Sequence, residues 1–259
     1  MNRDDIAKIL ERFDPIGLEK MDSVRLMNRT DTKYVFSIHK LPALLKLAIG
    51  KYQILEMDHK RDFIYNTIYM DTPEFLFYFQ HIKGKLQRFK VRFRVYESSG
   101  NSFLEVKCKT NKNQTIKHRI KNSLTRGCFD AQARRFLHDS IPFDPEDLRP
   151  LLTTSFVRLT LVGLETLERI TIDYNLSFSN DSGKVVELPF LAIAELKRTD
   201  INNRSPFCQI IRELKIRETG FSKYCIGNNL LYDLPRKNLL KPKLLLMDKI
   251  ENEFRCSVA

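Results

Sequence analysis

Residues 86–109, LQRFKVRFRVYESSGNSFLEVKCK, alternate between apolar and charged side chains on both sides of a turn signal around Gly100. Before the turn, the basic residues share one face and the apolar residues share the other; the basic residues are Lys90, Arg92 and Arg94. A period of two predicts a β-hairpin with one apolar face and one cationic face. A solvated antiparallel sheet shows the same pattern, so this hairpin alone does not predict a site.

The same alternation, with basic residues aligned on one face, recurs along the chain. Further strands are predicted at 27–36, 52–57, 63–70, 114–121, 152–162, 167–178 and 185–198, and helices at 3–12, 39–47, 129–138 and 205–218. About eight antiparallel strands can close into a barrel, which removes exposed sheet edges. We therefore predict an α+β fold: a closed, mostly antiparallel β-barrel, or tunnel, with short helices packed outside.

The domain organisation follows from where the predicted strands continue. The loop at 140–150, rich in proline and aspartate, is the best candidate for a linker, yet strands are predicted beyond it. We expect a single domain over residues 1–259, with a core at about 27–227 and a helical C-terminal tail at 228–259.

Composition restricts the class of partner. The chain has 259 residues, 42% hydrophobic residues and a net charge of +12, so it is globular and favours a polyanion: nucleic acid, an anionic membrane surface or a phosphate-rich small molecule. Its five cysteines lack CxxC spacing, which argues against a zinc site or a disulfide framework. The N-terminal residues do not form a signal peptide, and no apolar run reaches the ~20 residues of a membrane span. We expect a cytoplasmic protein, with peripheral attachment to the inner face of a membrane left open.

Charged strand faces that turn inward would give the barrel an aqueous, cationic lumen. The candidate phosphate-binding residues are Arg29, Lys33, Arg92, Arg94, Lys107, Lys117, Arg119, Arg158, Arg169, Lys197 and Lys223. Burying uncompensated cations side by side costs several kcal/mol per ion. A chain of phosphates would offset that cost, because each guanidinium can bind two phosphate oxygens.

The residues on these faces are suited to phosphoryl transfer, which needs aligned phosphates and charge neutralisation more than covalent help from the protein. The candidate catalytic residues are Lys33, Arg92, Arg94, Lys107, Arg158 and Lys197, and the candidate metal ligands are Glu105, Asp173 and Glu195. Carboxylates together with phosphate oxygens suit Mn²⁺ or Mg²⁺. The chain has no GxxxxGK[ST], GxGxxG or kinase motif, so the phosphate site must be built from strand side chains.

A series of short motifs, in order from about Met27 to Gly227, resembles the VTC domain. This is the polyphosphate polymerase domain of the vacuolar transporter chaperone complex, within the CYTH/triphosphate tunnel metalloenzyme superfamily. The motifs are Arg29-x-Asp31-x-Lys33-Tyr-Val-Phe, Tyr-Met-Asp-Thr-Pro, Lys-Val-Arg92-Phe-Arg94-Val-Tyr, Phe-Leu-Glu105-Val-Lys107, Ile-Lys117-His-Arg119, Arg169-Ile-Thr-Ile-Asp173, Ala-Glu195-Leu-Lys197 and Phe-Ser-Lys223-Tyr.

The resemblance implies a tunnel-shaped barrel that binds a nucleoside triphosphate or polyphosphate. It also implies that Glu195 matches the family's metal-binding glutamate and Lys223 a tunnel lysine. Polymerase members transfer the γ-phosphate of ATP to a polyphosphate chain, whereas relatives hydrolyse triphosphates. CYTH relatives open with ExExK, where this chain has Arg29 and Asp31, which favours the polymerase type. The chain looks like a free-standing bacterial domain, without the SPX domain and membrane helices of the eukaryotic complex.

Three functions remain open at this point. The first is a metal-dependent transferase that uses ATP and polyphosphate; the second is a hydrolase of tripolyphosphate, nucleotides or RNA 5′ ends; the third is a non-catalytic polyanion binder. Phe93 and Phe103 are expected opposite the cations, so stacking of nucleic-acid bases is not expected. Asp71 is read as a turn or cap residue, and Lys90 is placed at the tunnel mouth or outside. A membrane-protein partner is left open, and the oligomeric state is not predicted.

Overall fold

The computed structural model describes residues 3–23, 30–97, 100–112, 114–122, 129–199 and 205–258. The candidate Arg29 lies outside the described residues, as do Ser98 and Ser99 of the predicted hairpin turn.

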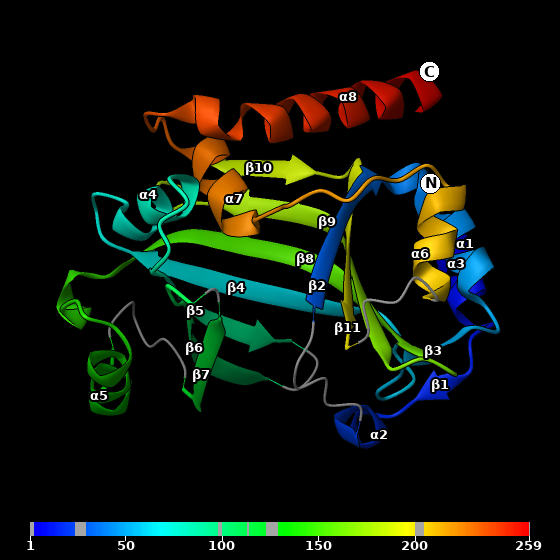
Figure 1. Ribbon diagram of the computed structural model, residues 1–259, viewed down its shortest axis with the longest axis horizontal. Coiled ribbons are helices and arrows are strands. Elements are labelled where there is room, and N and C mark those ends of the chain that lie inside the picture. Colours follow the sequence, from blue (N-terminus) through cyan, green and yellow to red (C-terminus); the bar gives the residue numbers. More distant parts are fainter. Residues whose placement is uncertain are drawn as a thin grey trace.

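One large sheet organises the molecule (Figure 1). Its main path runs through β2 (Thr30–Ser37), β11 (Leu191–Arg198), β9 (Glu168–Ser179), β8 (Arg149–Gly163), β4 (Phe63–Asp71), β5 (Arg88–Tyr96), β6 (Asn101–Lys109) and β7 (Thr115–Lys121). Every neighbouring pair on this path is antiparallel. Three short strands extend it: β3 (Tyr52–Leu55) pairs with β8, β1 (Pro15–Ile16) pairs parallel to β3, and β10 (Val185–Leu188) pairs with β9.

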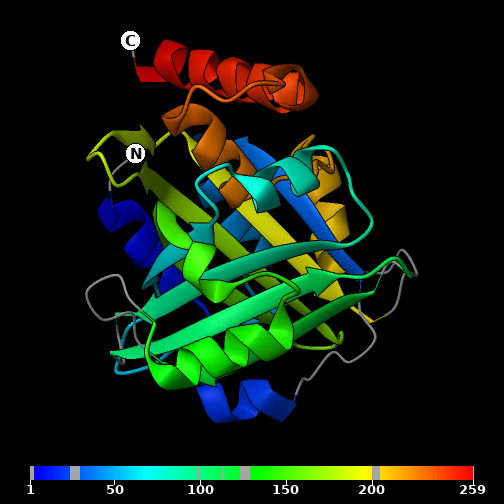
Figure 2. The ribbon, with the colours of Figure 1, turned by 90° about the vertical axis from the view of Figure 1, so that its left-hand side faces the viewer.

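The two ends of the path are β2 and β7, and within the described ranges no hydrogen-bonded ladder joins them. The prediction of an α+β fold with a large antiparallel sheet is therefore confirmed, but the closed barrel is not. The sheet nevertheless curves strongly, so that in Figure 2 strands from both halves of the path cross one another in projection.

The predicted hairpin forms β5 and β6. Arg92 lies opposite Glu105 and Lys90 opposite Lys107, so the charged side chains of both strands share one face. The other face is apolar and fully buried; it includes Val91, Phe93, Leu104 and Val106. Phe129, just before helix α5 (Ala131–Ser140), stacks on Phe93 with ring centroids 6.0 Å apart. Burial of this apolar face fixes the register, because a one-residue slip would move every charge into the core.

Helices cover the apolar outer faces of the sheet. Around the β1–β3 end lie α1 (Arg3–Leu10), α2 (Leu18–Ser23), the 3₁₀ helix η1 (Ile38–Lys40), α3 (Leu41–Ala48) and α6 (Pro206–Glu213) (Figure 1). Elsewhere lie α4 (Leu76–Ile82), η2 (Pro145–Asp147), α7 (Lys223–Leu231), η3 (Lys237–Leu240) and α8 (Lys241–Val258). The buried apolar residues form two clusters, one centred on α1, α3 and α6 and the other on α4, α7 and the hairpin.

The C-terminal tail forms the helix that its pattern predicts, and α8 is longer than the short helices expected around the barrel, with 18 residues. It lies across the top of the molecule in Figure 1, where Phe254 stacks on His39 with ring centroids 4.8 Å apart. In the part of the chain that the structure describes, no helix combines the length and the low polarity that crossing a bilayer requires.

One predicted strand, 185–198, is divided. Both β10 and β11 pair with β9, but Pro189 and Phe190 form a turn between them. Proline has no backbone N–H to donate to a sheet ladder, which explains the interruption. The division leaves β11 free to pair with β2 on its other side.

Candidate functional site

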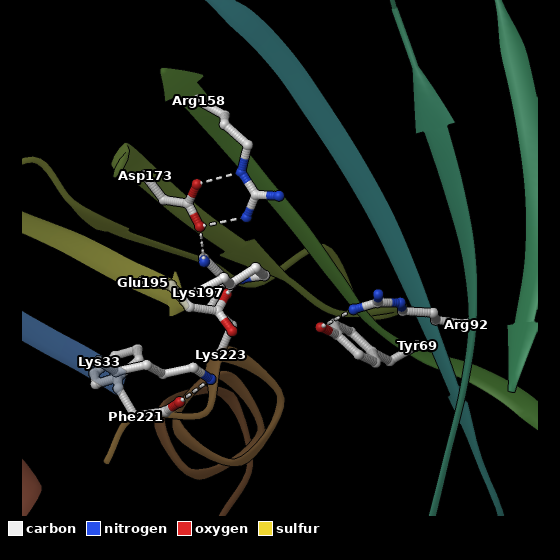
Figure 3. Close-up of polar contacts among 9 residues, drawn as sticks. All are labelled: Lys33, Tyr69, Arg92, Arg158, Asp173, Glu195, Lys197, Phe221 and Lys223. Carbon is white, nitrogen blue, oxygen red and sulfur yellow. Dashed lines mark hydrogen bonds and ion pairs between the residues drawn. The ribbon is translucent and has the colours of Figure 1, made fainter. Parts of the chain in front are cut away.

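Charged side chains from the strands and from the start of α7 gather in one group, here named the charged cluster. Its basic members are Lys33, Lys90, Arg92, Arg94, Lys107, Lys117, Arg158, Lys197 and Lys223, and its acidic members are Glu105, Asp173 and Glu195. Figure 3 shows side chains from β2, β4, β5, β8, β9, β11 and α7 directed toward one region. The period of two accounts for this, because alternate residues of every strand point to the same face.

At one side of the charged cluster, Asp173 on β9 binds two cations. Arg158 on β8 approaches its two oxygens with Nε and Nη2, at 2.6 and 2.8 Å, and Lys223 on α7 forms an ion pair with Oδ2. The Asp173 side chain is 4% exposed. Burial raises the pKa of Asp173, but Arg158 and Lys223 outweigh it and lower the pKa to about 2. Asp173 therefore belongs to a three-residue contact with Arg158 and Lys223.

At the other side, Glu105 on β6 is held in the same way. Arg92 on β5 contacts Oε2 with Nε at 2.8 Å and with Nη2 at 2.7 Å, and Lys117 on β7 forms an ion pair with Oε1. The Glu105 side chain is 1% exposed. Burial raises its pKa, whereas Arg92, Arg94 and Lys117 lower it to about 2. The basic neighbours of Glu105 therefore favour its ionised form at neutral pH.

The third acid, Glu195, lies on β11, the strand next to β9 in the sheet. Lys197, two residues along the same strand, forms an ion pair with it at 2.8 Å. Lys33 lies opposite Glu195 on β2 and donates a hydrogen bond to the carbonyl oxygen of Phe221 at 3.0 Å (Figure 3). The Glu195 side chain is 23% exposed and so is far more accessible than Glu105.

Arg94 differs from Arg92 in its partners. Its Nε atom is buried and has no hydrogen-bond partner. Burial lowers the pKa of Arg94, and the neighbouring Arg92 lowers it further. A buried guanidinium N–H without a hydrogen-bonding partner beside other cations is costly in an empty site, and an anion would relieve that cost.

Two further residues belong to the site and were missed from the sequence. Lys90 is not at the outside: it donates a hydrogen bond to Ser222 Oγ at 3.2 Å, and burial lowers its pKa to about 8. The Tyr69 hydroxyl accepts a hydrogen bond from Arg92 Nη1 at 3.4 Å and points into the group of cations (Figure 3). Burial raises the pKa of Tyr69, but Arg92, Lys90 and Arg94 lower it to about 8. Tyr69 lies opposite Arg92 in the register of β4 and β5, a pairing that the sequence did not show.

Some predicted site residues lie at the margin. Arg119 is exposed, with its guanidinium 5.0 Å from the ring centroid of Phe103, and Lys107 is also exposed. Arg169 lies opposite Lys197 on the face of β9 that carries Asp173. Arg29 lies outside the described residues, so its predicted role is not addressed by the structure.

The expected placement of the aromatic residues is partly wrong. Phe93 is buried on the apolar face, but Phe103 shares its face with Glu105, as the contact with Arg119 shows. Other aromatic rings also lie beside the cations. The ring centroid of Phe156 is 4.3 Å from Lys223 Nζ and 5.2 Å from Arg158 Cζ. Cation–π contacts of this kind help to compensate buried charge. The aromatic rings are therefore not confined to the face opposite the cations.

The three acidic candidates fit a divalent cation unequally. Glu105 and Asp173 each lie against two basic side chains and are almost fully buried. Glu195 has one ion-pair partner and is partly exposed. Within the described residues, no group of three or more His, Cys, Asp and Glu side chains could hold a metal ion. Glu195 is thus the candidate that fits Mn²⁺ or Mg²⁺, with phosphate oxygens completing the coordination.

Comparisons with solved structures agree with this fold. HpAC1 of Hippeastrum, an adenylyl cyclase candidate described as having a dominant triphosphatase activity, superposes with a TM-score of 0.51 at 13% identity, over 81% of this chain and 98% of its own. Adenylate cyclase candidates from Vibrio parahaemolyticus and Bacillus halodurans give TM-scores of 0.46 and 0.48 at 12% and 16% identity, covering 78% and 76% of this chain and 99% and 96% of theirs.

The comparison with protein families identifies the same family as the short motifs found along the chain. No curated protein matches the sequence. The VTC domain profile matches residues 28–232, which include every described member of the charged cluster. The chain therefore belongs to the VTC domain family.

Proposed function

We propose that this protein is a metal-dependent phosphotransferase that binds ATP and polyphosphate at the charged cluster and transfers the γ-phosphate of ATP to a polyphosphate chain. The observation that carries the proposal is an excess of buried or half-buried cations over acids, contributed by many strands and directed to one region. A row of anionic phosphates is the ligand that such an excess suits.

Most members of the charged cluster, together with Arg119 and Arg169 at its margin, have a proposed role. Lys33, Lys107 and Lys197 bind phosphate oxygens from the β2, β6 and β11 side; Arg92, Arg94, Lys117 and Arg119 do so from the hairpin side; Arg158, Arg169 and Lys223 do so from the β8, β9 and α7 side. Together they would align donor and acceptor phosphates and neutralise charge at the transferring group. Glu195 would hold the Mn²⁺ or Mg²⁺ ion, which when bound neutralises phosphate charge.

The acceptor phosphate of a polyphosphate chain has no proton that must be removed before it attacks. Transfer therefore requires positioning more than a general base. The site agrees with this, because Glu105 and Asp173, which could otherwise serve as bases, are fixed in ion pairs with pKa values of about 2.

A hydrolase is the second candidate, because the Hippeastrum protein that shares the fold is described as a triphosphatase. The substrate would then be inorganic tripolyphosphate or a nucleoside triphosphate. The experiment is incubation with γ-³²P-labelled ATP and Mn²⁺, followed by separation of products by size. Labelled polymer supports the transferase, and labelled free phosphate alone supports the hydrolase. Binding without either product would leave the protein as a non-catalytic polyanion binder and refute the proposal.

We further propose that the protein acts in the cytoplasm. The cysteines in the described part of the chain are free thiols: Cys108, Cys208, Cys225 and Cys256. Free thiols are typical of a reducing compartment.

A further inference from the structure

We propose that Glu105 and Asp173 are positioning residues and not metal ligands: each carboxylate holds two cations from different elements at a fixed place, ready for phosphate. The proposal rests on the proposed function in one respect, since it assumes that the charged cluster binds phosphate. It assigns to two acids a role that neither composition nor the resemblance indicated.

The geometry of Glu105 supports this role. The residue lies on the middle strand of three, and it binds Arg92 on the strand to one side and Lys117 on the strand to the other. One carboxylate thereby joins β5, β6 and β7 through their side chains. Because Arg92 contacts Oε2 with two nitrogens and Lys117 contacts Oε1, both oxygens are engaged.

Asp173 repeats the arrangement on the other side of the charged cluster. It binds Arg158 on the neighbouring strand β8 and Lys223 at the first turn of α7, a residue far away in sequence. Both of its oxygens are engaged, and the side chain is 4% exposed. Asp173 thus couples the sheet to α7 through a buried ion pair.

A divalent cation at either carboxylate would have to lie beside two positive side chains inside a buried site. The repulsion between these charges is strong where water is excluded. The ion would also have to displace a lysine or arginine. Arg92, Arg158 and Lys223 are 19%, 15% and 15% exposed and would be left largely buried and unpaired. Metal binding at Glu105 or Asp173 would therefore be opposed twice, whereas Glu195 is 23% exposed and has one ion-pair partner, with Lys33 and Arg158 as further cations nearby.

The positioning role has a clear physical benefit for phosphate binding. Without Glu105 and Asp173, the cations of the charged cluster would repel one another and their long side chains would spread. Holding Arg92, Lys117, Arg158 and Lys223 in place before the ligand arrives reduces the entropy lost on binding. The two carboxylates also supply negative charge that keeps the empty site folded.

The test compares Glu105→Gln and Asp173→Asn with Glu195→Gln as the matched acid-to-amide control. Melting temperatures are measured in EDTA with and without tripolyphosphate, and Mn²⁺ affinity is measured by calorimetry in the presence of tripolyphosphate. We expect Glu105→Gln and Asp173→Asn to melt lower than the wild type when empty and to keep the wild-type Mn²⁺ affinity. Although each variant has one negative charge fewer, we expect it to gain less from tripolyphosphate than the wild type does, because its cations are no longer held in place. Glu195→Gln is expected to lose about tenfold or more in Mn²⁺ affinity.

The proposal is overturned if Glu105→Gln or Asp173→Asn weakens Mn²⁺ binding as much as Glu195→Gln does, or if tripolyphosphate stabilises both variants as much as the wild type or more. If neither variant folds, Mn²⁺ titration of the wild-type protein without phosphate decides. One open carboxylate predicts weak binding of Mn²⁺, and tight binding of two or more ions would refute the assignment. Failure of the wild type to bind tripolyphosphate in EDTA would instead refute the proposed function.

Discussion

The Tyr224 hydroxyl donates a hydrogen bond to Asp71 Oδ2, and this buried contact joins α7 to the beginning of α4. Asp71 is 0% exposed and also accepts backbone N–H groups from Thr72, Phe77 and Tyr78 at 2.8, 2.8 and 3.0 Å. The expectation that Asp71 is a turn or cap residue is therefore confirmed. Since Lys223 directly precedes Tyr224, the same contact helps to hold that lysine at Asp173.

Replacing Tyr224 by Phe should lower the free energy of unfolding by about 1–3 kcal/mol, because Asp71 Oδ2 would lose a buried hydrogen-bond donor. Tripolyphosphate binding should also weaken, because α7 would hold Lys223 less firmly. Urea denaturation and calorimetry measure the two effects. Tyr34→Phe is the control, as its hydroxyl is buried near Cys208 Sγ at 4.0 Å, on the face of β2 away from Lys33. Equal stability of the Tyr224→Phe variant and the wild type would contradict the expectation.

Arg92→Met and Arg94→Met should both lose phosphate affinity but should change stability in opposite directions. Removing Arg92 leaves Glu105 buried with one partner fewer, at a cost of about 3–5 kcal/mol. Removing Arg94 deletes a cation whose Nε has no hydrogen-bond partner and relieves repulsion with Arg92, so the empty protein should melt higher. Thermal melts in EDTA separate the two outcomes. A shift of the same sign in both variants would show that this assignment of partners is wrong.

Phosphate affinity should fall as the pH rises through about 8. Lys90 and Tyr69 both have a pKa of about 8, so above that pH Lys90 loses its positive charge and Tyr69 gains a negative one. Both changes oppose anion binding. By linkage, the binding of phosphate near pH 8 is accompanied by uptake of protons. The groups around Tyr69 that set this behaviour are Lys90, Arg92 and Arg94 on β5 and Lys223 and Tyr224 on α7.

The measurement is the ratio of tripolyphosphate affinities of the wild type and Tyr69→Phe, taken from pH 7 to pH 9 by calorimetry. The ratio cancels the ionisation of the ligand itself. Between pH 7 and pH 9 the wild type should lose more affinity than Tyr69→Phe, because phenylalanine cannot ionise. A ratio that does not change with pH would exclude Tyr69 as a titrating group of the site.

Gly227→Ala should destabilise the protein by about 1–3 kcal/mol. A Cβ atom at this position of α7 would lie 2.9 Å from Leu152 Cδ1 and 2.9 Å from Phe178 Cδ1, both of which are buried in the sheet beneath. The helix would have to move away from β8 and β9, and Lys223 with it. Thermal denaturation measures the stability. Gly17→Ala is the control, because a Cβ atom at that position has no neighbouring atom within 4 Å. A Gly227→Ala variant that is more stable than the wild type and binds tripolyphosphate with unchanged affinity would contradict the prediction.

The sequence by itself determined the strand pattern, the shared face of the basic residues and the family. The alternation is sufficient to predict the strands and the shared face, because side-chain direction in a strand depends only on the position along the chain. It also predicted that Asp71 caps a turn, from local chemistry. By contrast, barrel closure and the extent of the strand at 185–198 could not be predicted without knowing which strands pair. The closure is not confirmed, and Pro189 divides the strand.

The tertiary structure alone decided which charges are partners. Glu105, Asp173 and Glu195 look equivalent in the sequence, yet two are buried between cations from other elements and one is partly exposed. Burial is the main cause of the lowered pKa of Lys90, and Arg92, Lys90 and Arg94 on the neighbouring strand β5 lower the pKa of Tyr69. Burial and through-space electrostatics depend on contacts distant in sequence, and the local pattern of a strand carries no information about them.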